Sequence, residues 1–212
     1  VTQDGRFIDV EGAEINMFMI ADGTDLSPLN GSRWMSDNIS ELNSGYQVIQ
    51  GSISVKNGII TADGSGHSNY ALCLLYDAGK AGRLMLQTSI LPQREEPYML
   101  ALELARHRIK SFLDLSENWS LFYLSDDNPA VQRWEESRLI FTEALVCDDV
   151  EKTGELARRA LVIAIDASER LTMAHAQILL HRRYAKKGAS SSTLGVNVAS
   201  PRFDEPLREI IK

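Results

Sequence analysis

The chain has 212 residues, of which 44% are hydrophobic and 24% charged, a composition typical of a folded protein with one or two domains. Its net charge of -7 disfavours DNA and RNA as partners, because nucleic-acid affinity comes largely from basic side chains that neutralise phosphates. No apolar stretch approaches the roughly 20 residues that span a bilayer, so no membrane contact is expected.

The first part of the chain has the pattern of short β-strands separated by glycine-containing turns. Asn57-Gly58 lies between two β-branched runs and predicts a two-residue hairpin, because both turn positions need positive φ. Further strands are predicted in INMFMIADG (15–23), NYALCLLY (69–76) and GRLMLQTSIL (82–91). We therefore expect residues 1–91 to form an antiparallel β-sandwich of the jelly-roll or carbohydrate-binding-module type.

After Pro92 the apolar residues recur at helical spacing. A first helix is predicted to begin at Pro97, and a second at Pro129 with Asp127 or Asn128 as its N-cap. The predicted buried face of the second helix consists of Val131, Trp134, Phe141 and Leu145. A third helix is predicted over residues 150–186. The fold class is thus α+β: a three-helix antiparallel bundle in residues 92–187, packed on or next to the sandwich.

Residues 188–212 form the last predicted region. A Gly- and Ser-rich linker precedes the apolar run TLGVNV, a proline-containing turn and the start of an amphipathic helix. A strand, loop and helix start in this order begin a βαβ unit, which needs about 30 residues. The region is interpreted as a linker followed by the truncated start of another domain.

Two segments, LQTSILPQREEPYMLALELARHRI (86–109) and LGVNVASPRFDEPLREIIK (194–212), resemble bacterial glycoside hydrolase family 10, the xylanase family, in a form with a long N-terminal extension. The resemblance implies that the first segment belongs to the non-catalytic extension and that LGVNV is the first strand of the catalytic (β/α)₈ barrel. Both catalytic glutamates of the family follow later barrel strands, so no catalytic residue is assigned and this chain is expected to be inactive. The resemblance also implies extracellular or periplasmic localisation and a downstream barrel as partner.

Candidate carbohydrate-binding residues are aromatic side chains with a polar companion, since sugar rings present apolar C–H faces that stack on aromatic rings. The candidates in the β-rich part are Trp34, Tyr46, Tyr70, Tyr76 and Gln87. Trp34 lies in polar loop sequence, where it either forms a platform or packs back on the edge of the sandwich. Tyr70 and Tyr76 alternate with leucines on one strand face, which favours a core position for at least one of them.

A charged cluster surrounds the start of the first predicted helix, and it is interpreted as a structural ion network and not as a general acid/base site. It consists of Arg94, Glu95, Glu96, Glu103 and Arg106. Glu103 and His107 lie four residues apart but lack a third ligand, so neither a metal nor a cofactor is expected. Cys73 and Cys147 lack metal-binding spacing and are interpreted as free, buried thiols.

Two functions remain open on this basis. The first is an accessory module that binds xylan or a related plant cell-wall polysaccharide and tethers a catalytic barrel to it. The second is a structural module that braces the barrel or pairs two copies of the chain as a homodimer, without binding glycan. Exposure of Trp34 together with a tyrosine would favour the first function, and burial of both would favour the second.

Overall fold

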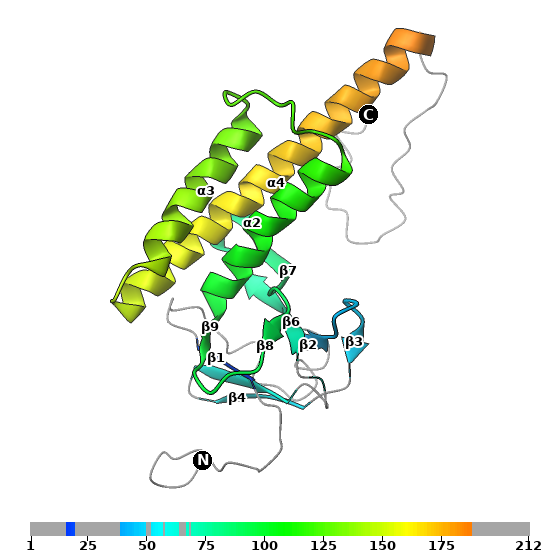
Figure 1. The fold of residues 1–212 in the computed structure, drawn as a ribbon. Helices are drawn as coiled ribbons and strands as arrows, with labels where there is room; N and C mark the ends of the chain where they lie inside the picture. The colour runs from blue at the N-terminus through cyan, green and yellow to red at the C-terminus, as the bar shows by residue number, and fades with distance from the viewer. Residues whose placement is uncertain are drawn as a thin grey trace, which may run out of the picture. The chain divides into compact units, whose positions relative to one another are not determined.

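The computed structural model describes residues 16–19, 39–49, 52–56, 58–63, 67 and 69–187. The described residues form two sheets, three α-helices and one short 3-10 helix at Gly79–Ala81, so the expected mixture of strands and helices is confirmed (Figure 1). Backbone contacts divide the chain into two compact units, Val1–His175 and Ala176–Lys212, and residues 176–187 are the described part of the second unit. The predicted linker and strand of residues 188–212 lie outside the described residues.

The first sheet has the strand order β4-β5-β1-β9, with β4 at Ile53–Lys56, β5 at Ile59–Ala62, β1 at Asn16–Met19 and β9 at Tyr98–Met99. Lys56 pairs with Ile59 across β4 and β5, which leaves a two-residue loop in which Gly58 has φ of 75°. The hairpin predicted from Asn57-Gly58 is therefore confirmed. β1 pairs antiparallel with β5 and parallel with β9.

The second sheet has the order β3-β2-β6-β7, with β8 also paired to β6. Its strands are β2 (Ile39–Leu42), β3 (Val48–Ile49), β6 (Asn69–Asp77), β7 (Arg83–Gln87) and β8 (Leu91–Pro92). All of these pairings are antiparallel. One face of β6 is buried, and it presents Tyr70, Leu72, Leu74 and Tyr76. The Tyr70 hydroxyl donates a hydrogen bond to the Ala62 carbonyl of β5, so this face is turned toward the first sheet.

The first helix, α2, spans Leu100–Asn118, and the predicted start at Pro97 is wrong. Tyr98 and Met99 pair instead with Phe18 and Met19 of β1, and the Tyr98 ring stacks on Phe18 with centroids 5.8 Å apart. Strand pairing thus holds these two residues in an extended conformation, although their apolar side chains also fit a helical pattern.

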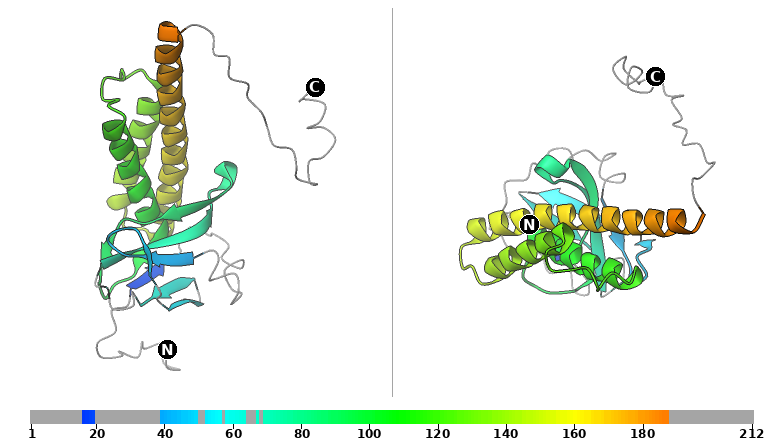
Figure 2. Two further views of the ribbon diagram at one scale, coloured as in Figure 1. Left: turned by 90° about the vertical axis from the view of Figure 1, so that its right-hand side faces the viewer. Right: turned by 90° about the horizontal axis from the view of Figure 1, so that it is seen from above.

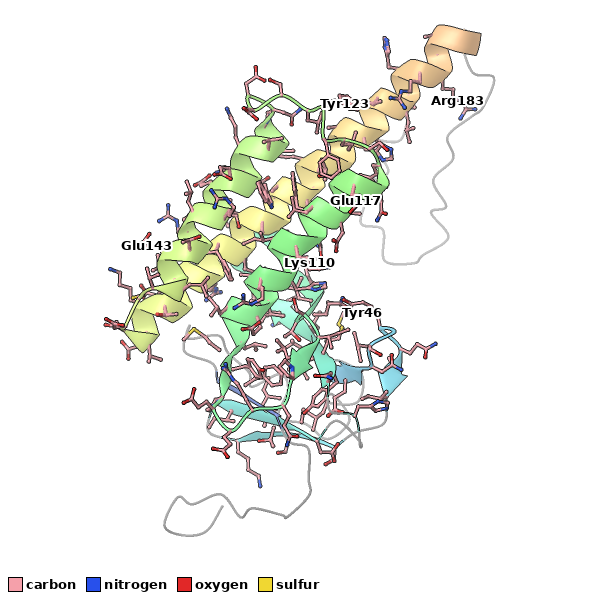
Figure 3. All side chains as sticks on the ribbon, viewed as in Figure 1. Tyr46, Lys110, Glu117, Tyr123, Glu143 and Arg183 are labelled. Atoms are coloured by element: carbon pink, nitrogen blue, oxygen red, sulfur yellow. The ribbon has the colours of Figure 1, made fainter. Side chains whose placement is uncertain are left out.

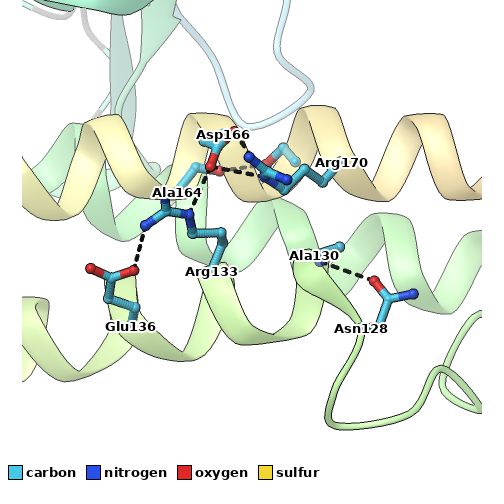
Figure 4. Close-up of polar contacts among 8 residues, drawn as sticks. Asn128, Ala130, Arg133, Glu136, Ala164, Asp166 and Arg170 are labelled. Atoms are coloured by element: carbon cyan, nitrogen blue, oxygen red, sulfur yellow. Dashed lines mark hydrogen bonds and ion pairs between the residues drawn. The ribbon is translucent and has the colours of Figure 1, made fainter.

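The second helix, α3, spans Pro129–Leu145 and begins as predicted. The Asn128 side chain accepts a hydrogen bond from the Ala130 amide at 2.9 Å, and Pro129 is the first helical residue (Figure 4). The buried face differs from the prediction, because Leu145 is exposed. The buried residues are Ala130, Ser137, Ile140, Phe141 and Ala144.

The third helix, α4, spans Val150–Lys187, in agreement with the predicted range. Up to His175 it runs beside α2 and α3, and these helices lie on one side of the strands (Figures 1 and 2). The Ser137 hydroxyl of α3 donates to the Ala160 carbonyl of α4 at 2.8 Å. Small side chains permit this approach, since Ala157, Ala160 and Ala164 are all fully buried.

One hydrophobic core joins the sheets to the helices within the first unit. It combines Phe18 and Ile60 of the first sheet with residues of the second sheet and of all three helices, including Leu104, Phe141 and Leu161. This core contains residues from both sides of positions 91 and 92, where the sequence predicts the boundary between the sandwich and the helical region. In the described part of the chain, no helix is long and apolar enough to cross a membrane.

Candidate functional site

Two of the five candidate sugar-binding residues are buried and form no exposed platform. Tyr70 and Tyr76 are 0% and 1% exposed between the sheets and the helices, so neither ring can stack on a ligand. Their alternation with Leu72 and Leu74 on β6 already indicates a core position, and this position applies to both tyrosines. Trp34 lies outside the described residues.

Tyr46 is different, because it lies at the tip of the hairpin that joins β2 to β3. Leu42 pairs with Val48, and the Asn43 amide donates to the Gln47 carbonyl at 3.0 Å. The Asn43 side chain accepts hydrogen bonds from the amides of Gly45 and Gln47 at 2.9 and 3.0 Å. The loop is therefore held by its own hydrogen bonds, and Tyr46 has a defined backbone conformation.

That conformation is unfavourable for tyrosine. Tyr46 has φ of 57°, in the left-handed region where a Cβ atom costs roughly 1–2 kcal/mol and where hairpins of this type favour glycine. The sequence does contain a glycine in this loop, but it is Gly45, one residue earlier. The Tyr46 side chain is nevertheless 47% exposed. Strained residues gather at functional sites, which makes Tyr46 a candidate.

His107 of α2 connects Tyr46 to Gln87, the second candidate that the structure leaves partly exposed. The Tyr46 and His107 ring centroids are 6.4 Å apart, with the ring planes tilted by 54°. The His107 Nε2 atom lies 2.9 Å from the Gln87 Nε2 atom at the end of β7. Tyr46 and Gln87, which are 41 positions apart in the sequence, thus both contact one imidazole.

Lys110 and Asp114 extend this site along α2. Their Nζ and Oδ2 atoms are 2.7 Å apart, and both side chains are at least half exposed. The hydrogen bond to Asp114 is the main cause that raises the pKa of Lys110, and the electrostatic influence of Tyr46 raises it further. Figure 3 labels Tyr46 and Lys110. We call Tyr46, Gln87, His107, Lys110 and Asp114 together the Tyr46 surface.

His107 is uncharged at neutral pH. Burial lowers its pKa, and so do the positive charges of Lys110 and Arg108, while Asp114 opposes them. With the Gln87 amide nitrogen facing the ring as a donor, the neutral imidazole accepts at Nε2 and carries its proton on Nδ1, and the opposite orientation of the amide would reverse these roles. Nδ1 is buried and has no hydrogen-bond partner among the residues that the structure describes.

The predicted ion network has a separate location, where β9 joins α2. The Arg94 guanidinium lies 3.6 Å from the centroid of the Tyr98 ring and donates to the carbonyls of Glu96 and Pro97. Glu103 accepts from the Arg106 Nε atom at 3.0 Å. Burial raises the pKa of the Tyr98 phenol, which also senses Arg94, Glu103 and Arg106. Glu95 and Glu96 are exposed.

Other polar clusters have structural explanations. Arg133 of α3 contacts Glu136 and also Asp166 of α4, which in turn contacts Arg170, so this network joins two helices (Figure 4). No group of three His, Cys, Asp or Glu side chains suited to a metal is found in the described part of the chain. Both cysteines are free thiols, but each is only partly buried, whereas buried positions were predicted. Burial raises the pKa of Cys73, which disfavours a reactive thiolate.

No model of a known protein family matches the chain, and no curated protein or solved structure is found to be similar to it.

Proposed function

We propose that the chain is a non-catalytic accessory region of a xylanase-like glycoside hydrolase and that it binds plant cell-wall polysaccharide through the Tyr46 surface. The observation that carries this proposal is the exposed Tyr46 ring, held at φ of 57° in a position that favours glycine. Packing alone does not explain this conformation, because the side chain is half exposed. Binding of a ligand to the ring would explain why a strained residue is kept at this position.

The neighbouring groups suit a neutral sugar. A pyranose ring can stack its C–H face on the phenol ring, while its hydroxyl groups need both donors and acceptors. The Lys110 ammonium supplies donors and the Asp114 carboxylate supplies acceptors. These two charges form an ion pair, so the Tyr46 surface has little net charge to attract a uronate. Xylan or a related uncharged polysaccharide is the proposed ligand.

The resemblance to family 10 glycoside hydrolases supports the rest of the proposal. The resembling segment 86–109 covers β7 in part, β8, β9 and the first half of α2, and it includes Gln87 and His107. In this proposal the two sheets form a β-sandwich, the helices form a three-helix bundle, and residues 194–212 begin a catalytic barrel. No carboxylate pair of this chain is assigned to glycoside hydrolysis, which needs two such groups about 5–9.5 Å apart across the scissile bond.

A second candidate function is an interaction module without glycan binding. The turn between α3 and α4 exposes three neighbouring apolar residues, Leu145, Val146 and Val150, at 47%, 75% and 50%. Such a group suits a contact with the proposed barrel or with a second copy of the chain. In that case the Tyr46 surface would have no role in binding polysaccharide.

Tyr46→Ala tests the first candidate through retention on insoluble xylan. Loss of the stacking ring is expected to weaken retention about tenfold, whereas Tyr46→Phe, which keeps the ring, should retain most of it. Tyr184→Ala is the matched control, because Tyr184 is 48% exposed and lies in α4. Retention of Tyr46→Ala at the wild-type level would remove Tyr46 from the site. A wild-type chain that no cell-wall polysaccharide retains would favour the interaction module.

A further inference from the structure

We propose that His107 positions the Tyr46 ring in its neutral form, so that polysaccharide binding is lost when the imidazole gains a proton. This inference rests on the proposed function and adds to it a residue that acts through Tyr46. It starts from the location of His107 between the hairpin tip and β7, where the imidazole contacts both Tyr46 and Gln87.

The hydrogen bond to Gln87 depends on the protonation state of His107. The neutral ring accepts at Nε2 from the Gln87 amide nitrogen, 2.9 Å away. A protonated imidazole has a hydrogen on both nitrogens, so two donors would then face each other across this distance. Turning the Gln87 amide would give Nε2 an acceptor but would leave the positive charge buried beside Arg108 and Lys110. We therefore expect the imidazole itself to move toward solvent, and the Tyr46 ring then loses the surface against which it lies.

The charges around His107 also oppose protonation. Arg108 and Lys110 lie on the same helix, and both lower the pKa of His107. The nearby carboxylates already interact with these cations, since Asp114 pairs with Lys110 and Glu169 of α4 influences Arg108. The hairpin contributes Tyr46 to this site, and the strands contribute Gln87 and Cys73, which pair across β6 and β7. A third positive charge at this position therefore lacks a carboxylate of its own.

The direction of the pH effect follows from the pKa. The pKa of His107 lies below its ordinary value of 6.5, so the neutral form dominates at neutral pH and is lost as the pH falls through the lowered pKa. If only the neutral form positions Tyr46, the apparent affinity falls about tenfold for each pH unit below that point. The same shift makes the folded state lose stability as the pH falls below 6.5.

The first arm of the test compares retention on xylan at about pH 8 and about pH 5, the range over which histidines titrate. The ratio of the two retentions is expected to be large for the wild type and close to one for His107→Gln, which cannot titrate. His175→Gln is the matched control, because the His175 ring stacks on Trp119, with centroids 4.4 Å apart, and not on the Tyr46 ring. A wild-type ratio of one, or an unchanged ratio in His107→Gln, would overturn the inference.

The second arm needs no ligand and therefore separates this inference from the proposed function. The Tyr46 ring resonances of the free protein are followed by NMR while the His107 imidazole is titrated. We expect the Tyr46 signals to shift with the same midpoint as His107, and to stay constant in His107→Gln. If they follow His107 but xylan is not retained, the proposed function fails and the positioning role stands. If they do not follow it, the positioning role is wrong whatever the protein binds.

Discussion

Two non-glycine residues of the described chain have positive φ, and they have different explanations. Ser120 has φ of 55° and follows the C-terminus of α2, where the Leu121 amide donates to the Ser116 carbonyl at 2.8 Å. This bond and the burial of Leu121 form a helix-ending motif that needs a left-handed residue. The strain at Ser120 therefore serves to end a helix. Tyr46 ends no helix, and its side chain is about half exposed, which is why a binding function is proposed for it.

Ser120→Gly is expected to raise the free energy of unfolding by about 0.5 kcal/mol. Removal of the Cβ atom relieves roughly 1–2 kcal/mol of strain, and part of this gain is offset by the greater freedom of glycine in the unfolded chain. Urea unfolding measures the difference. Ser120→Ala is the control and should not stabilise, because alanine keeps the Cβ atom. A Ser120→Gly protein less stable than the wild type would show that the serine side chain has another structural role.

At the scale of residues, the sequence predicted burial better than it predicted the site. The alternation of Tyr70 and Tyr76 with leucines is a local pattern, so a core position could be inferred for them. The strain at Tyr46 could not be inferred, because its φ angle depends on the register of the hairpin. The neighbouring Gly45 is the residue for which the sequence would predict the left-handed conformation. The sequence indicated His107 only as a neighbour of Glu103 and gave no sign of its contacts with Tyr46 and Gln87. Its position depends on how α2 packs against β7, which brings together residues 20 positions apart.

At the scale of elements, the predictions succeeded where a few neighbouring residues determine the backbone. The Asn57-Gly58 hairpin and the α3 start at Asn128 and Pro129 are of this kind, since turn geometry and helix capping involve adjacent residues. The predictions failed where a segment distant in the sequence determines the backbone conformation. Tyr98 and Met99 are extended because β1 pairs with them in parallel, and no pattern near residue 98 indicates that partner.

The buried face of α3 shows the same limit. Phe141 is buried as the pattern indicates, but Leu145 is exposed, and the small residues Ser137 and Ala144 are buried on the face that α4 approaches. Ser137 contributes through its hydrogen bond to the Ala160 carbonyl, a contact that a pattern of apolar residues does not predict. Periodicity indicates that a helix exists, but the neighbouring helix selects which face is buried.

At the scale of the whole molecule, the shared core predicts that sheets and helices unfold together. Leu161 of α4 is fully buried in this core, and Leu161→Ala is expected to lower the free energy of unfolding by about 2–5 kcal/mol. Circular dichroism follows the helices and hydrogen exchange follows the β6 amides. Both should show the same loss.

Leu139→Ala is the control for this experiment, because Leu139 is an exposed residue of α3 and its truncation should change stability by less than about 0.5 kcal/mol. If Leu161→Ala weakens the helices while the β6 amides keep their protection, residues 1–91 and 92–187 are independent domains. The sequence alone could not decide this question, since it places an element boundary near residue 92 but does not show whether one core crosses it.

The most direct test of the central claim, that Tyr46 is present for binding and not for stability, is to measure both properties of Tyr46→Gly. Glycine relieves roughly 1–2 kcal/mol of left-handed strain, and this gain is offset in part by the greater freedom of glycine in the unfolded chain and by the loss of about 0.5–1.5 kcal/mol from the contact with His107. We predict a free energy of unfolding within about 1 kcal/mol of that of the wild type, together with a loss of retention on xylan. A destabilised Tyr46→Gly protein that xylan retains as well as the wild type would contradict the claim.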